Sequence, residues 1–169
     1  LKHQGWDRAI NKHLRYGGKL LGICGGFQML GDQIHDLDGV EGMPGSCDGL
    51  GLLQMETRLH PQKQLNLAKG HLLFGGAPVS GYEMHMGISE GTALEKPLVD
   101  LGEHQDGAVS LDDQIAGTYL HGLFEQPKAC DALLVWAGLE TPDTPDYHAI
   151  REREIERLAN AAEEHLDIE

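Results

Sequence analysis

The chain has 169 residues, and its 40% hydrophobic content suffices for the core of a folded domain, which excludes an intrinsically disordered protein. Its 27 acidic and 13 basic residues give a formal net charge of −14, and so acidic a surface repels nucleic acid and anionic membranes. No apolar run approaches the roughly 20 residues of a membrane-spanning helix and no basic-then-apolar leader is evident, so we expect neither membrane insertion nor secretion.

The N-terminal part of the chain predicts alternating helix and strand. Apolar residues four apart predict an amphipathic helix over residues 6–16, which a Gly-Gly pair ends. A short apolar run over 19–23 predicts a buried strand, and a second set of apolar residues then follows at helical spacing, at Phe27, Met29, Leu30 and Ile34. This order of helix, strand, sharp turn and helix is typical of an α/β unit with a parallel sheet.

The middle of the chain predicts a loop and then short strands. Residues 36–48 are rich in Gly and Asp and contain a proline, which is typical of a loop. Three β-like pieces follow at 50–57, 70–74 and 79–87, most of them bounded by Gly or Pro. Residues 91–107 are polar and predict an irregular segment.

The last third predicts two strands and two helices. Short strands are expected at 108–111 and 115–119, around an Asp-Asp turn, and a helix at 129–137. A terminal helix is expected from one apolar face, made of Ile155, Leu158, Ala162 and Leu166. We therefore divide the chain into a domain over 1–140 and a linker with an amphipathic C-terminal helix over 141–169.

Cys24 is the candidate nucleophile. It stands between a predicted strand and a predicted helix, with Gly22 before it and Gly25 and Gly26 after it. A nucleophile on such a turn is exposed above the sheet, and the turn needs small neighbours. The N–H groups that begin the following helix favour the thiolate and can receive an oxyanion. A buried structural cysteine in a Gly-rich turn is the alternative that this motif alone leaves open.

His121 is the favoured base among ten histidines. A cysteine nucleophile needs a base that is close in space, and His121 follows the predicted strand at its C-terminal end, where ligand sites of open α/β sheets lie. His85 is the second candidate. Two interpretations of its surroundings stay open: Tyr82, Met84 and Met86 alternate into the core and leave Glu83 and His85 outside, or Glu83 and His85 face the mouth of the site.

The other two cysteines, Cys47 and Cys130, are interpreted as structural. An odd number of cysteines does not predict a disulfide framework, and it suits a reducing compartment, so we expect a cytoplasmic location. No His-Glu-x-x-His or Cys-x-x-Cys spacing occurs, so we expect no metal site.

Four stretches occur together and in a recognisable order: GICGGFQMLG (22–31), GLGLL (49–53), GYEMHMG (81–87) and GTYLHGLFE (117–125). Together they resemble the C-terminal glutamine amidotransferase domain of the cobyric acid synthase family, in the cobyric and cobyrinic acid branch of the class I glutamine amidotransferases. The resemblance implies a flavodoxin-like α/β fold of three layers with a mostly parallel central sheet. It also implies that the chain is N-terminally truncated, because the strand with an upstream oxyanion loop would precede Leu1.

The same resemblance implies the chemistry. Cys24 would be the nucleophile and His121 the base, and the substrate-binding residues would be Gly25, Gly26, Gln28, Glu83 and His85. The domain would need no cofactor and would take ammonia from glutamine. A separate N-terminal synthetase domain, using ATP and Mg, would then amidate carboxylates of a corrin substrate, adenosylcobyrinic acid a,c-diamide, in cobalamin synthesis.

One departure and several rival functions accompany the resemblance. Many class I amidotransferases carry a His-x-Glu pair, but Gly122 and Leu123 follow His121 here, which leaves Glu83 and Glu125 as possible substitutes for the carboxylate. The rival functions are amidotransferase domains for cobyrinic acid a,c-diamide or for cell-wall precursors, a cysteine-dependent ester hydrolase, and a catalytically silent docking module.

Overall fold

The computed structural model describes residues 1–166, with every side chain among them except that of Lys2. A 3-10 turn (Lys2–Gln4) leads into helix α1 (Trp6–Arg15), and strand β1 (Leu20–Ile23) and helix α2 (Gly25–Leu30) follow. The predicted first helix and first strand are thus confirmed. The second helix is shorter than predicted, because Gly31 ends it, and Ile34 lies in a strand instead.

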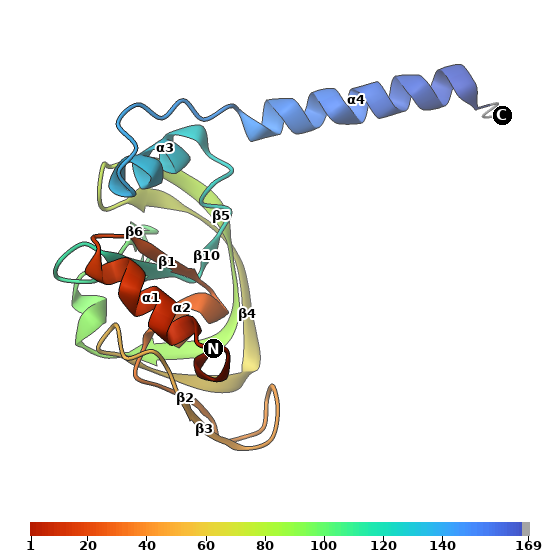
Figure 1. The fold of residues 1–169 in the computed structure, drawn as a ribbon. Coiled ribbons are helices and arrows are strands. Elements are labelled where there is room, and N and C mark those ends of the chain that lie inside the picture. The colour runs from red at the N-terminus through yellow and green to blue at the C-terminus, as the bar shows by residue number, and fades with distance from the viewer. Residues whose placement is uncertain (167–169) are drawn as a thin grey trace.

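Strands dominate the middle of the chain. The short strands β2 (Gln33–Asp36) and β3 (Gly45–Asp48) precede two long ones, β4 (Glu56–Leu72) and β5 (Pro78–Glu90). The β4–β5 pair curves along one side of the molecule (Figure 1), and its register shifts between Leu59 and Gln64. The predicted loop over 36–48 is wrong at its C-terminal end, where β3 pairs with β2. Of the three predicted β-like pieces, 79–87 lies within β5, 70–74 overlaps only the end of β4, and 50–57 is wrong for residues 50–55, because β4 begins at Glu56.

The remaining elements are short strands and two helices. A 3-10 turn (Thr92–Glu95) precedes strands β6 (Val99–Asp100) and β7 (Gln105–Asp106). Strands β8 (Ala108–Val109), β9 (Ile115–Thr118) and β10 (Leu120–His121) follow, and then helices α3 (Pro127–Trp136) and α4 (Tyr147–His165). The strands predicted around the Asp-Asp turn and both helices are confirmed.

The strands form two sheets. One has the order β1-β9-β8, and the other has the order β10-β5-β4-β2-β3 with β6 and β7 attached to β4. Among the described residues only β1 with β9 and β2 with β4 pair in parallel, and the other pairings are antiparallel. The expected α/β class is confirmed, but the expected mostly parallel sheet is wrong, because short connections and a long hairpin impose antiparallel pairing.

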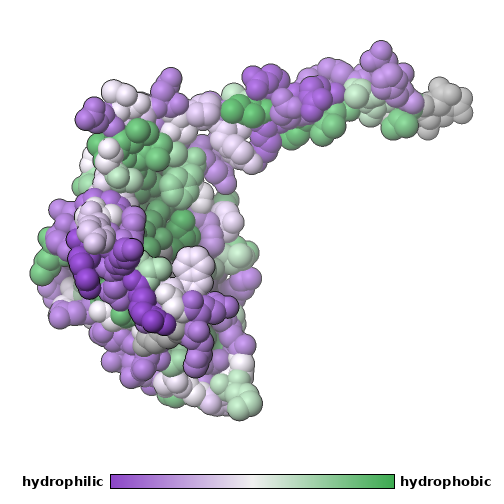
Figure 2. All heavy atoms as spheres, in the orientation of Figure 1, coloured by the Kyte–Doolittle hydropathy of each residue, from purple (hydrophilic) through white to green (hydrophobic). Residues whose placement is uncertain are grey.

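Helix α4 extends away from the rest of the molecule (Figure 1). Asp146 caps its N-terminus by accepting a hydrogen bond from the backbone N–H of Ala149 at 3.0 Å. Its apolar face is not covered: Ile155 is 52% exposed and Leu158 is 63% exposed. Figure 2 shows a second gathering of apolar side chains between α3 and α1. Within residues 1–166, no helix has both the length and the apolar content of a membrane span.

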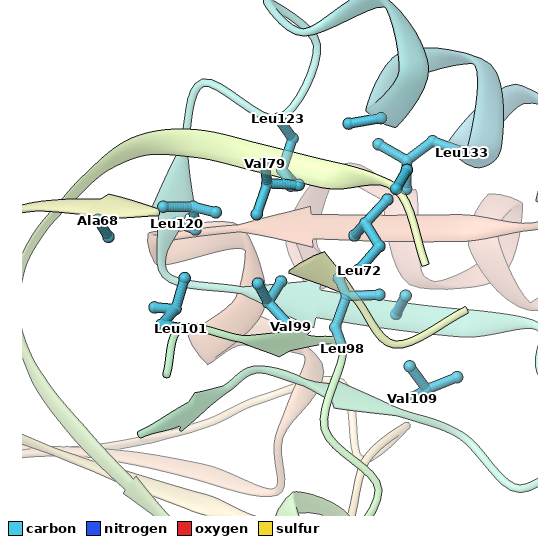
Figure 3. Packing of buried hydrophobic residues seen from close by; sticks show 13 residues of the cluster. Ala68, Leu72, Val79, Leu98, Val99, Leu101, Val109, Leu120, Leu123 and Leu133 are labelled. Atoms are coloured by element: carbon cyan, nitrogen blue, oxygen red, sulfur yellow. The ribbon is translucent and has the colours of Figure 1, made fainter. Parts of the chain in front are cut away.

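Two clusters make up the hydrophobic core. The larger one packs α3 and the β9–β10 segment against β4, β5 and β6 (Figure 3), and its fully buried members include Leu72, Leu98, Val99, Leu120 and Leu123. The second cluster packs α2 against β8 and β9, around Phe27, Leu30, Met55 and Tyr119. Helix α2 and strand β9 therefore share one core, and this fixes the turn that carries Cys24.

Phe27 is the centre of the second cluster, and shortening it should destabilise the fold. Its ring is fully buried, meets the ring of Tyr119 edge to face at 5.2 Å, and occupies the space left by the absent side chain of Gly117. We expect Phe27→Ala to lower the free energy of unfolding in urea by about 3–5 kcal/mol. Phe27→Leu, which keeps most of the volume, should cost less than about 1.5 kcal/mol. Equal losses in the two variants would contradict this role.

Candidate active site

Cys24 occupies the turn between β1 and α2, as predicted. Its backbone angles are φ 53° and ψ −116°, and within residues 1–166 Asp113 is the one other non-glycine residue with a positive φ. Such strained conformations gather at functional sites. The N–H of Cys24 donates to the carbonyl of Thr118 at 2.9 Å, which ties the turn to the end of β9. Cys24 is only partly buried, which fits an accessible nucleophile better than a sealed structural cysteine.

The three glycines near Cys24 differ in whether the structure leaves room for a larger side chain. A Cβ atom at Gly22 would lie 2.7 Å from the carbonyl oxygen of Gly26, so only glycine lets β1 approach α2 this closely. At Gly25 and Gly26, by contrast, a Cβ atom would meet nothing within 4 Å. The predicted need for small neighbours therefore holds for Gly22, and the other two glycines leave open space beside the N–H groups that begin α2.

His121 ends β10 and lies flat against Tyr82 of β5. The two rings stack with their centroids 4.9 Å apart and their planes 4° from parallel. The Nε2 atom of His121 is buried and has no hydrogen-bond partner among the described residues. Buried polar atoms without partners are rare in folded proteins, and a catalytic role is one of the few explanations for such an atom. The sulfur of Cys24 is not hydrogen-bonded to this imidazole; it donates to the carbonyl of Met84 at 3.5 Å instead.

The fold nevertheless brings Cys24 and His121 to one region. Strands β1 and β9 are parallel neighbours, so their C-terminal ends lie at the same edge of the sheet. Cys24 directly follows β1, and His121 comes three residues after β9 ends. Both residues also contact β5, at Met84 and Tyr82, which are two residues or about 6.7 Å of strand apart. Catalytic hydrogen bonds are often long before substrate binds, so this arrangement is compatible with a cysteine–histidine pair.

Neither carboxylate that could replace the missing triad member bonds to this imidazole. Glu83 lies opposite Leu120 in the β5–β10 register, and its Oε1 accepts a hydrogen bond from Nε2 of His104 at 3.1 Å. Glu125 lies 3.8 Å from Nε2 of His148 in α4. Both carboxylates thus have other partners, which leaves the third member of the triad unfilled by the residues that sequence reasoning named.

The burial of the two faces of β5 is the reverse of what one of the two interpretations expects. Alternation was expected to bury Tyr82 and to expose Glu83, but Tyr82 is 38% exposed and Glu83 is 4% exposed. The reason is the partners: Tyr82 covers the ring of His121, whereas Glu83 is buried beside His104 and Asp106. The first of the two open interpretations is therefore wrong for Tyr82 and Glu83.

Tyr119 connects two of the predicted site residues, and sequence reasoning missed it. Its hydroxyl accepts a hydrogen bond from Nε2 of Gln28 at 3.4 Å and shares one with Ser89 at 2.7 Å. The ring of His85 stacks on that of Tyr119 at 3.9 Å. Burial raises the pKa of Tyr119, so the phenol stays protonated. Gln28 and His85 are thus fixed by one buried aromatic residue.

Two cavities adjoin these residues. One of about 450 Å³ opens beside Gly25 and Gln28 and is also lined by residues of the segment 41–47, among them the exposed Cys47. Its volume suits a small molecule. The other, about 190 Å³, is lined by both polar and apolar residues, and its polar ones include Glu83, His85 and Asp106. The structure therefore separates the predicted binding residues into two groups, with Gly25 and Gln28 in one and Glu83 and His85 in the other.

Metal binding gains no support from the side chains that the structure places. Within residues 1–166, no group of three or more His, Cys, Asp or Glu side chains could hold a metal ion.

Comparison with protein families adds to this geometry. A family model described as a CobB/CobQ-like glutamine amidotransferase domain matches residues 1–129, which is more than half of the chain and includes every predicted site residue. Helix α4 and most of α3 lie outside the match. The chain therefore belongs to the family of CobB/CobQ-like glutamine amidotransferase domains.

Proposed function

We propose that this chain is a glutaminase whose nucleophile is Cys24, and that it supplies ammonia for the amidation of a corrin substrate. The observations that carry the proposal are the strained Cys24 turn, tied to the end of β9, and the buried Nε2 atom of His121, which has no hydrogen-bond partner among the described residues. A structural role explains neither the backbone strain nor the unsatisfied nitrogen, whereas a nucleophile and its base explain both.

The proposed reaction has two half-steps. The thiolate of Cys24 attacks the side-chain carboxamide carbon of glutamine, and backbone N–H groups, including that of Gly25, hold the tetrahedral oxyanion. Loss of one such donor typically raises a barrier by about 3–4 kcal/mol. His121 gives the proton that it took from the Cys24 thiol to the departing ammonia, which leaves a glutamyl thioester. His121 then takes a proton from water, the water attacks the thioester, and glutamate and the free thiol are released.

The binding residues fit this scheme in two places. Gly25 and Gln28 line the larger of these two cavities, and Gly26 lies between them in the chain, so we assign glutamine to that cavity. Glu83 and His85 line the smaller cavity, and we assign them to the side from which ammonia leaves. The resemblance of the motif at 81–87 supports this second assignment.

The resemblance also supports the finer identity, the amidotransferase domain of cobyric acid synthase in the cytoplasm. On this proposal an N-terminal synthetase domain of the same protein uses ATP and Mg to amidate adenosylcobyrinic acid a,c-diamide. The first 140 residues form the amidotransferase domain, and the linker and helix α4 follow it. Amidation of cobyrinic acid or of cell-wall precursors remains the alternative for the same glutaminase chemistry.

Hydrolysis of glutamine by the purified protein tests the proposal. We expect glutamate and ammonia in equal amounts from L-glutamine, and covalent labelling of Cys24 by a glutamine-analogue electrophile, located by peptide mass spectrometry. Hydrolysis of simple esters without glutamine turnover would instead indicate a cysteine-dependent hydrolase. A protein that neither turns over glutamine nor is labelled would be a silent docking module, and the proposal would be wrong.

A further inference from the structure

Asp106 is a buried carboxylate that the mechanism above does not use. It ends β7, is 6% exposed, and comes from the stretch that the sequence predicts as irregular. Its Oδ2 atom accepts three hydrogen bonds: from the hydroxyl of Thr118, from the N–H of Tyr119 at 3.0 Å, and from the N–H of Leu120 at 3.2 Å. One carboxylate oxygen thus receives donors from three consecutive residues.

Those three residues join the two proposed catalytic groups. Thr118 is the last residue of β9, and its carbonyl accepts the N–H of Cys24. Leu120 immediately precedes His121 and pairs with β5. The chain therefore passes from one sheet to the other within these residues, and all three are buried. Without Asp106, the buried N–H of Tyr119 would lose the acceptor that the structure gives it, and the N–H of Leu120 would keep only the hydroxyl oxygen of Thr118, at 3.0 Å.

We propose that Asp106 is a positioning residue for the cysteine–histidine pair. Its carboxylate fixes the backbone of residues 118–120, and this backbone sets where His121 stands relative to Cys24. The inference rests on the proposed glutaminase function. Asp106 acts through the main chain rather than through the imidazole ring, which distinguishes it from the absent triad carboxylate, whose place two residues after His121 is taken by the buried Leu123.

The surroundings of Asp106 show that ionising it has a cost. Burial raises its pKa, the negative charge of Glu83 raises it further, and the hydrogen bonds from Thr118, Leu120 and Tyr119 act in the opposite direction. A neutral asparagine of the same shape would avoid the cost of burying charge but would accept the same donors more weakly. The role of this carboxyl group therefore rests on its three hydrogen bonds to residues 118–120, which fix the geometry of that backbone.

The test compares Asp106→Asn with Asp112→Asn. Asp112 is a matched control, because its carboxylate also accepts a hydroxyl and a backbone N–H, from Ser110 and Gln114, but in the exposed turn before β9. For each variant we would titrate active sites with the glutamine-analogue electrophile and measure turnover per labelled site. We expect Asp106→Asn to lower kcat roughly 10- to 100-fold, with KM and the labelled fraction nearly unchanged, because small displacements of a catalytic group cost this much. Asp112→Asn should match the unaltered protein.

Three results would overturn the inference. One is a kcat of Asp106→Asn close to that of the unaltered protein; another is a parallel fall of labelled fraction and turnover, which a purely structural role would give. If Asp106→Asn does not fold, the comparison of Thr118→Val with Thr118→Ser replaces it. The valine variant removes one donor to Asp106 and should turn over glutamine more slowly per labelled site than the serine variant. Equal rates in these two variants would be the third contradicting result. If the unaltered protein neither hydrolyses glutamine nor is labelled, the proposed function fails and this inference with it.

Discussion

Replacing Cys24 by alanine should reduce glutamine hydrolysis at least about a thousandfold, because covalent catalysis cannot proceed without its nucleophile. The fold should be little affected, since the side chain is only partly buried and makes one hydrogen bond, to the carbonyl of Met84. The measurement is the release of glutamate at saturating glutamine. The thermal unfolding of the variant and of the unaltered protein is followed by circular dichroism. Labelling by the glutamine-analogue electrophile should disappear in the same variant.

Cys130→Ala is the matched control for that experiment. Cys130 lies in helix α3, which packs in the other core cluster and contributes nothing to the turn at Cys24. We expect this variant to retain turnover and labelling. If Cys24→Ala kept a tenth or more of the activity of the unaltered protein, a nucleophile other than this thiol would have to act, and the proposed mechanism would be wrong.

The position of Cys24 was predictable because the information is local. An apolar run of strand length, a glycine on either side of the cysteine and apolar residues at helical spacing define a strand-to-helix turn within about ten residues. His121 was predictable for a related reason, since it follows the strand that pairs in parallel with β1. Parallel neighbours end at the same edge, so two local patterns sufficed to place the two residues in one region.

The contacts of β5 were less predictable. A strand shows a period of two, but the period does not say which face is buried when apolar and polar residues alternate in Tyr82-Glu83-Met84-His85. The answer depends on partners distant in sequence, His104 for Glu83 and His121 for Tyr82. The length of β4 was missed for a similar reason, because much of it is polar and exposed and is held by its backbone pairing with β5.

The contacts of Asp106 were also not predictable from the sequence. It stands in a polar stretch that has neither helix nor strand periodicity, and its carboxylate meets its N–H donors only because β7 lies beside the β9–β10 connection. An Asp followed by Gly in such a stretch is typical of a turn, so nothing in the local pattern marks it as a partner of Thr118. A residue that acts on a site through the backbone of another element is therefore the hardest kind to predict from a single sequence.

Replacing His121 by glutamine should lower turnover of glutamine by roughly 10²- to 10⁴-fold, the usual contribution of a positioned acid–base group. Glutamine can place an amide nitrogen near the position of the buried Nε2 atom, but it cannot exchange a proton with ammonia or water at neutral pH.

The matched control is His148→Gln. His148 lies on the protruding helix α4, where its side chain is 42% exposed and 3.8 Å from a glutamate, so its loss should leave turnover unchanged. The pair of variants is compared by initial rates of glutamate release and by the fraction of Cys24 that the electrophile labels. Turnover of His121→Gln within tenfold of the unaltered protein would show that the imidazole stacked on Tyr82 is not the base. Loss of turnover in both variants would point to destabilisation of the fold instead. Because the nitrogen of His121 has no partner among the described residues, its substitution breaks no hydrogen bond, and we expect the loss of activity to occur without a comparable loss of stability.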